Sequence, residues 1–185
     1  AVMGTYLAYR IHNIWVFNPY WGYDGGGHIG YFYSLVETFR FPSIEKNYIA
    51  WHEPFYYILN APVLMLARFF TNDIGLHLKT LGLAQVFWST LTLFFVYRIS
   101  STLLSRGYAL ATAILFSALP AFHQVSTFLT NELFSYLFAF LLTYVFIRRL
   151  QEEQFHRHDG WLFGSLIGLG TVSKITVIVP AAILI

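Results

Sequence analysis

The sequence predicts an all-α fold in which several membrane-spanning helices are joined to a long first loop that carries interfacial helices. Hydrophobic types make up 57% of the 185 residues and charged types only 11%, whereas soluble domains average about 45–50% and about 25%. The net charge is +2 and there is no Cys. This composition excludes an ordinary soluble domain, a disordered chain, a nucleic-acid-binding protein and any disulfide or thiolate chemistry.

Apolar segments of roughly the length that spans a bilayer, about 20 residues, set the expected helices. Residues 1–17 are interpreted as the end of a first span. The next spans are expected at 76–97, 107–127 and 131–147, and a fourth at 161–185. Because the chain stops inside this last apolar run, we interpret residues 1–185 as the N-terminal part of a longer transmembrane domain.

Arginine distribution predicts the orientation of these spans. The loops 98–106 and 148–160 fall on the same side and hold five Arg, whereas the loop near 128–130 holds none. Positively charged loops stay in the cytoplasm. The sequence therefore predicts cytoplasmic arginine loops and an extracytoplasmic location for residues 18–53, which are poor in Lys and Arg.

The segment 18–75 is expected to form this outer loop. Phe32, Leu35, Val36 and Phe39 recur at helical spacing, which is typical of a short helix in the interface plane. Pro54–Phe70 is ambiguous, because it is apolar but only about 17 residues long. If this segment spans the membrane, residues 18–53 are located in the cytoplasm. If it lies along the surface, residues 18–53 are extracytoplasmic.

Ionisable residues at membrane depth are costly and therefore indicate function. Lys174 lies in the middle of the predicted span 161–185, where a Lys costs roughly 2.5–3.5 kcal/mol, so it needs an anion or a polar cavity. Glu132 opens the span 131–147. It either stabilises the positive end of that helix or faces an outward cavity.

Two motifs in the outer loop combine ionisable groups with turn residues. Asp24 precedes three Gly and then His28, a pattern that also occurs in simple turns. His52 and Glu53 stand directly before Pro54. An imidazole and a carboxylate are candidate ligands for a divalent cation such as Mg²⁺ or Mn²⁺, and the alternative is a polar cap at the interface.

In chain order, these motifs resemble the GT-C glycosyltransferases of the protein-mannosyltransferase and aminoarabinose-transferase branch. The resemblance rests on Asp24 with His28, on the run His52-Glu53-Pro54-Phe55-Tyr56, on Glu132, and on the run from Gly168 to Lys174 before Pro180. Two residues depart from the family pattern, because Glu53 stands where Pro is frequent and Glu132 where Asp is common.

The resemblance implies transfer of a sugar from a polyprenyl- or dolichyl-phosphate donor to a hydroxyl of a protein, lipid or glycan, outside the cytoplasm and with inversion. It implies two interfacial helices, Gly30–Arg40 and Pro54–Phe70, so that Pro54–Phe70 does not span. The implied catalytic residues are Asp24, as general base, and Glu132. The expected substrate-binding residues are His28, Glu53, Tyr56 and Lys174, and the candidate metal ligands are His52 and Glu53.

Two rival interpretations remain: a transporter fragment that uses Lys174 and Glu132 as coupling charges, and a membrane subunit that kept the fold without the chemistry. The sequence shows no pair of broken helices in matching halves, which disfavours a transporter. No Asn-x-Ser/Thr site occurs in the chain, which favours a prokaryotic plasma membrane over the endoplasmic reticulum.

Overall fold

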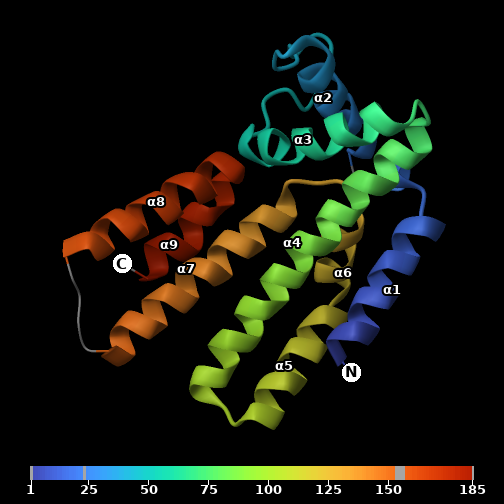
Figure 1. The fold of residues 1–185 in the computed structure, drawn as a ribbon. Helices are drawn as coiled ribbons and strands as arrows, with labels where there is room; N and C mark the ends of the chain where they lie inside the picture. Colours follow the sequence, from blue (N-terminus) through green and yellow to red (C-terminus); the bar gives the residue numbers. More distant parts are fainter. Residues whose placement is uncertain (1, 23, 153–156, 185) are drawn as a thin grey trace.

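The computed structural model describes residues 2–22, 24–152 and 157–184, and over these residues every regular element is helical, which confirms the all-α class. Residue 1, which begins the predicted span 1–17, and residue 185, which ends the predicted span 161–185, lie outside the described ranges. Figure 1 shows a bundle of helices with two further helices lying across one end. The bundle contains α1 (Val2–Val16), α4 (Ile74–Leu103), α5 (Arg106–Ala118), α7 (Glu132–Glu152) and α8 (Arg157–Ser173), and the crossing helices are α2 (Gly25–Thr38) and α3 (Phe55–Phe70).

Two helices are individually long and apolar enough to cross a membrane. They are α4, which contains the predicted span 76–97, and α7, which begins one residue inside the predicted span 131–147 and extends beyond its end. The predicted span 107–127 is a bent pair, in which α5 and α6 (Pro120–Thr127) meet at 66°. Pro120 lacks an N–H and its ring clashes with the preceding turn of a continuous helix, so the bend occurs where the sequence interrupts helical hydrogen bonding.

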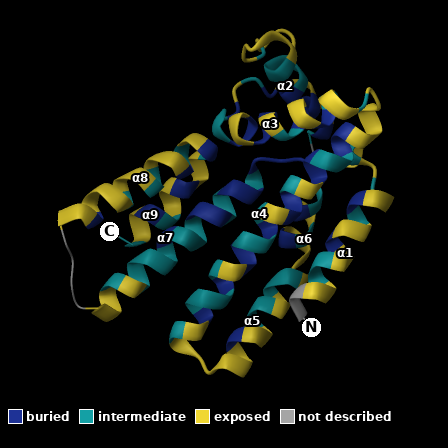
Figure 2. Ribbon diagram, in the orientation of Figure 1, coloured by how far each residue is buried: buried dark blue, intermediate teal, exposed yellow. Residues whose placement is uncertain are grey.

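The α3 helix lies across the end of the bundle that also carries α2 (Figure 1), and we call this end the loop end. Its 16 residues reach only about 24 Å at 1.5 Å per residue, short of the ~30 Å hydrocarbon layer. It buries Tyr56, Tyr57 and Leu64 in an aromatic core with Phe32 and Phe134. Figure 2 shows that buried residues gather where α3 meets the ends of α4 and α7.

The segment expected to form one helix over 161–185 is interrupted at Lys174. The α8 helix ends at Ser173, Lys174 is extended, and the chain continues as η2 (Ile175–Val177) and α9 (Ile178–Leu184). The chain then returns against α7 and α8 (Figure 1). Gly170 permits this return, because an added Cβ there would lie 2.6 Å from the Val177 side chain and 3.1 Å from that of Phe138.

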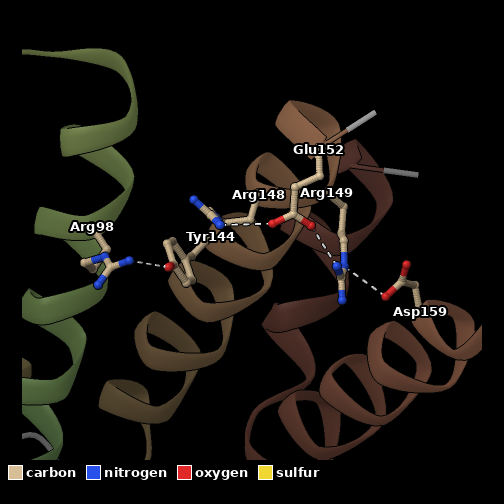
Figure 3. A network of polar contacts seen from close by, with 6 residues as sticks. All are labelled: Arg98, Tyr144, Arg148, Arg149, Glu152 and Asp159. Atoms are coloured by element: carbon tan, nitrogen blue, oxygen red, sulfur yellow. Dashed lines mark hydrogen bonds and ion pairs between the residues drawn. The ribbon is translucent and has the colours of Figure 1, made fainter. Parts of the chain in front are cut away.

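The opposite end of the bundle, here called the arginine end, is held by polar contacts between three helices (Figure 3). Arg98 on α4 donates to the Tyr144 hydroxyl on α7 at 2.8 Å, and Arg149 on α7 pairs with Glu152 at 2.8 Å. Arg149 also reaches Asp159 on α8 at 2.9 Å, and that carboxylate is buried. The two arginine loops therefore lie at the same end, as the sequence predicts, although which side of the membrane they face stays a prediction.

Candidate functional site

A cavity of about 470 Å³ opens where the loop end meets the bundle, and it brings together five of the residues selected from the sequence. They come from four separate parts of the chain. The predicted residues on its wall are Asp24, His28, His52, Glu132 and Lys174. The remaining wall is contributed by residues that the sequence did not single out, namely Trp51, Gln124, Val125, Phe128 and Thr130.

Asp24 reaches the cavity from the turn that precedes α2. Its backbone is left-handed, with φ 57° and ψ 15°, a region in which Asp and Asn are enriched among non-glycine residues. Its side chain forms no capping bond to α2, although it stands at the position where Asp usually caps a helix. Gly25 allows the turn to close, because an added Cβ would lie 2.9 Å from the carbonyl oxygen of Pro19. The turn and the site interpretations of Asp24 are therefore compatible.

The two histidines of the cavity are close to each other and neutral near pH 7. Their ring centroids lie 5.4 Å apart. Burial, helped by the neighbouring Lys174 ammonium and by any proton on His52, lowers the pKa of His28 to about 3. Burial and Lys174 also lower the pKa of His52, against the opposing effect of nearby carboxylates. His28 Nδ1 is 2.6 Å from the hydroxyl of Tyr57, a buried partner that fixes its ring.

Lys174 and Glu132 form an ion pair on the wall of the cavity. The Lys174 ammonium lies 2.8 Å from Glu132 Oε1, with the Lys side chain 14% exposed and the Glu side chain 43% exposed. Glu132 is the first residue of α7, where a carboxylate also stabilises the helix dipole. The anion that the sequence predicted for Lys174 is therefore present, but Lys174 stands at a break between helices at the loop end and not in the middle of a continuous span. Both charges face the same space as Asp24.

Glu53 and Tyr56, which the sequence predicted as substrate-binding residues, do not line the cavity. Glu53 is half-buried, and its two oxygens accept hydrogen bonds from the Ile175 amide at 2.9 Å and the Asn131 side chain at 3.4 Å. Tyr56 is wholly buried between Phe32 and Phe134. Direct contact of either side chain with a substrate stays a prediction.

His52 and Glu53 stay predicted metal ligands that the structure does not test. Each Glu53 oxygen accepts one N–H group and keeps a lone pair for a cation, but two residues alone do not complete the near-octahedral oxygen coordination that Mg²⁺ demands. Among the described residues no group of three His, Cys, Asp or Glu side chains is arranged to hold a metal. His52 Nδ1 is buried and has no hydrogen-bond partner among the described residues. A metal requirement therefore stays an untested prediction, and the chemistry below uses only side chains.

Some wall residues carried a sequence signal that was not used. Gln124 is a polar residue inside the predicted span 107–127, and the same cost argument that selected Lys174 applies to it. Trp51 and Phe128 had no such signal, because aromatic residues are expected throughout a membrane interface. Phe128 reaches the wall as the residue that directly follows α6, and Trp51 reaches it from the loop between α2 and α3.

The fold and the cavity define a polytopic helical membrane protein with a charged, partly enclosed site at one end of its bundle. Residues 61–185, about two thirds of the chain, match the family described as dolichyl-phosphate-mannose-protein mannosyltransferase. The chain therefore belongs to this family and is a membrane glycosyltransferase of the GT-C type. No curated protein and no solved structure matches the chain. The matched range includes Glu132 and Lys174 and begins after Asp24, His28 and His52.

Proposed function

We propose that the protein transfers a sugar from a polyprenyl- or dolichyl-phosphate donor to a hydroxyl group of a protein, lipid or glycan. Transfer takes place on the extracytoplasmic side, with inversion at the anomeric carbon. The observation that carries the proposal is the convergence of Asp24, Glu132 and Lys174 on one cavity. This cavity lies where α2 and α3 meet the spans, a position open to a lipid donor from the bilayer and to an acceptor from water.

Asp24 acts as the general base of this reaction. It is half-buried and its carboxylate is not used to cap α2. It takes the proton of the acceptor hydroxyl, and the oxygen then attacks the anomeric carbon. The bond between that carbon and the phosphate oxygen breaks, and the lipid phosphate leaves with the electron pair. Direct displacement by the acceptor inverts the anomeric centre.

Lys174 and Glu132 balance the charge that moves during the transfer. Negative charge grows on the leaving phosphate, and a preorganised cation stabilises it best in a site that excludes water. Lys174 is the ammonium on the cavity wall, and Glu132 holds it in place until the donor is bound. The neutral rings of His28 and His52 add hydrogen-bonding groups without adding repulsive charge.

The location follows from the same proposal. A lipid-linked sugar presented outside the cytoplasm requires the loop end to face outward and the arginine end to face the cytoplasm. The absence of Asn-x-Ser/Thr sites from the sequence supports a prokaryotic plasma membrane over the endoplasmic reticulum.

A transporter is the second candidate, and one structural observation favours it. Two predicted spans are broken, at Pro120 and at Lys174, and transporters place substrates at breaks in helices. Family membership supports the transferase, and a single assay separates the two functions.

The assay uses the full-length protein in proteoliposomes with a radiolabelled polyprenyl-phosphate sugar and extracts of candidate acceptors. A transferase releases polyprenyl phosphate and labels an acceptor in proportion to the protein added. A transporter moves label across the bilayer while the donor stays intact. An intact donor with no movement identifies a non-catalytic subunit and contradicts the proposal.

A further inference from the structure

The break between α8 and α9 is held by residues from two distant parts of the chain. The amide N–H of Ile175 donates to Glu53 Oε1 at 2.9 Å, across 122 positions of sequence. The buried Asn131 side chain donates to the Ser173 carbonyl oxygen at 3.3 Å and to Glu53 Oε2 at 3.4 Å. Glu53 and Asn131 therefore hold the two residues on either side of Lys174.

The break creates a helix start that its own sequence does not cap. Lys174 occupies the N-cap position of η2 and its side chain forms no capping bond. The first N–H groups of a helix need an acceptor, and a negative charge is favoured beside them. Glu53 supplies both, because its carboxylate accepts the first N–H of the apolar segment Ile175–Leu184. Local N-caps are normally Ser, Thr, Asp or Asn, and here the cap comes from the outer loop.

The position of this cap links Glu53 to the cavity. Lys174 lies between Ser173 and Ile175, so the backbone that Glu53 and Asn131 fix is the backbone that directs the Lys174 side chain. That side chain lies on the cavity wall and pairs with Glu132 at 2.8 Å. If the chain continued as a helix through Lys174, the φ and ψ of this residue would change from −166° and 122° to helical values, and the direction of its side chain would change with them.

We propose that Glu53 is a positioning residue that caps the Ile175–Leu184 segment from a distance and thereby directs the Lys174 ammonium into the cavity. Its effect on sugar transfer rests on the proposed function, whereas its effect on the backbone does not. This role explains why a carboxylate stands in the His52-Glu53-Pro54 run, because Pro has no side-chain acceptor for the Ile175 amide.

Hydrogen exchange of the full-length protein, followed by mass spectrometry without donor, tests the backbone part directly. A cap contributes about 0.5–2 kcal/mol, so exchange in a peptide covering 173–177 should rise about 2- to 30-fold in Glu53→Ala. Glu53→Gln keeps an acceptor oxygen and should retain most of the protection. Glu37→Ala is the matched control, because it removes a carboxylate that pairs with Arg68 at 3.0 Å between the C-terminal turns of α2 and α3. Unchanged exchange in Glu53→Ala overturns the proposal.

A double-mutant comparison of sugar transfer tests the link to Lys174. If Glu53 acts through Lys174, Glu53→Ala should lower transfer in the wild-type background and have little further effect in Lys174→Ala. Glu53→Gln should restore transfer, which a metal ligand would not allow. Fully additive losses contradict a positioning role. If Glu53→Ala yields no folded protein, Glu53→Asp, which is one methylene shorter, provides the same two comparisons. An inactive wild type refutes the proposed function and leaves the exchange result to decide the cap.

Discussion

At the scale of single residues, His28 gives the cavity a measurable pH dependence. Burial lowers its pKa from 6.5 to about 3, so the unfolded chain binds the proton more readily than the folded chain between these values. The contribution of neutral His28 to the free energy of unfolding is fully present above pH 6.5 and is lost as the pH falls toward 3. The expected slope reaches about 1.4 kcal/mol per pH unit for one such group.

Thermal unfolding of the protein in detergent between pH 7 and 4.5 measures this slope. His28→Gln should reduce the acid-dependent fall in Tm, since Gln does not titrate, even though losing the Tyr57 contact lowers Tm at all pH values. His52 shifts in the same direction and accounts for part of the remaining slope. An equal slope in wild type and His28→Gln would show that His28 is not buried as a neutral ring.

Some residues at the cavity could be predicted from the sequence, and others could not because their contacts are distant along the chain. Glu132 and Lys174 were predictable as wall residues because a charge at or near a span, in a chain with 11% charged residues, is costly and needs a reason. Asp24, in the predicted outer loop, was selected instead by the Gly-rich motif that follows it and by the family resemblance. Tyr57, which holds His28, and Glu53 as a cap were not predictable, because their partners lie 29 and 122 positions away. Such contacts depend on the tertiary fold, which composition and spacing do not determine.

At the scale of helices, Gly170 permits the return of the chain after α8. Gly170→Ala would place a methyl group 2.6 Å from the Val177 side chain, and overpacking of this kind costs about 1–3 kcal/mol. Gly168 lies on the same helix with no described atom within 4 Å of an added Cβ. Gly168→Ala should therefore be neutral or stabilising, by up to about 1 kcal/mol of helix propensity.

Tm measurements of these two variants compare the same chemical change in two environments. A lower Tm in Gly170→Ala alone agrees with the return of α9 against α7 and α8. Equal effects would mean that α8 and α9 form one continuous helix, as the apolar run 161–185 predicted. No helix-breaking residue stands at Ser173 or Lys174, because the nearest Gly and Pro are Gly170 and Pro180.

Lys79 joins α1 to α4 and provides a second test at this scale. Its ammonium donates to the carbonyl oxygens of Ile14, Trp15 and Phe17 at the C-terminal end of α1, where a positive charge is favoured. Lys79→Met keeps the aliphatic stem and leaves these carbonyls without their donor, at a cost of about 1–3 kcal/mol. The control Lys46→Met changes an exposed loop residue and should shift stability by less than about 0.5 kcal/mol. Chemical unfolding monitored by tryptophan fluorescence compares the two variants. Matching unfolding midpoints would show that Lys79 does not stabilise the contact between α1 and α4.

At the scale of the whole molecule, the account requires the loop end to face outward. Ser43 and Ser101 are both exposed. Ser43 lies in the loop between α2 and α3, and Ser101 lies in the last turn of α4 near Arg98, so membrane sidedness should decide their reactivity. In intact cells a membrane-impermeant thiol reagent should label Ser43→Cys and spare Ser101→Cys. After permeabilisation both should react. The reverse pattern would remove the proposed transfer of a sugar outside the cytoplasm.

The overall architecture was largely predictable and the arrangement of its ends was not. Apolar segments of sufficient length located α4 and α7, since the length of a span is set by the bilayer. The same rule did not reveal the bend between α5 and α6, or the return of α9. The bend falls at Pro120, which a length rule does not consider, and the return of α9 depends on contacts with α7 and α8. Both shape the cavity: α6 contributes Gln124 and Val125 to its wall, Phe128 directly follows α6, and the break after Ser173 contributes Lys174.

The central claim is that Asp24 removes the acceptor proton in this cavity, and the rate of sugar transfer by Asp24→Asn tests it most directly. The substitution keeps the shape of the side chain and removes its basicity. The matched control is Asp73→Asn, because Asp73 caps α4 by accepting from the Leu76 amide at 3.1 Å and Asn caps a helix equally well. Asp24→Asn should insert normally, bind the lipid donor with unchanged affinity and lose about 10²–10⁴-fold in kcat, while Asp73→Asn keeps wild-type turnover. Unchanged kcat in Asp24→Asn, or a loss of donor binding or of folded protein, would contradict the assignment and leave Asp24 as a turn residue.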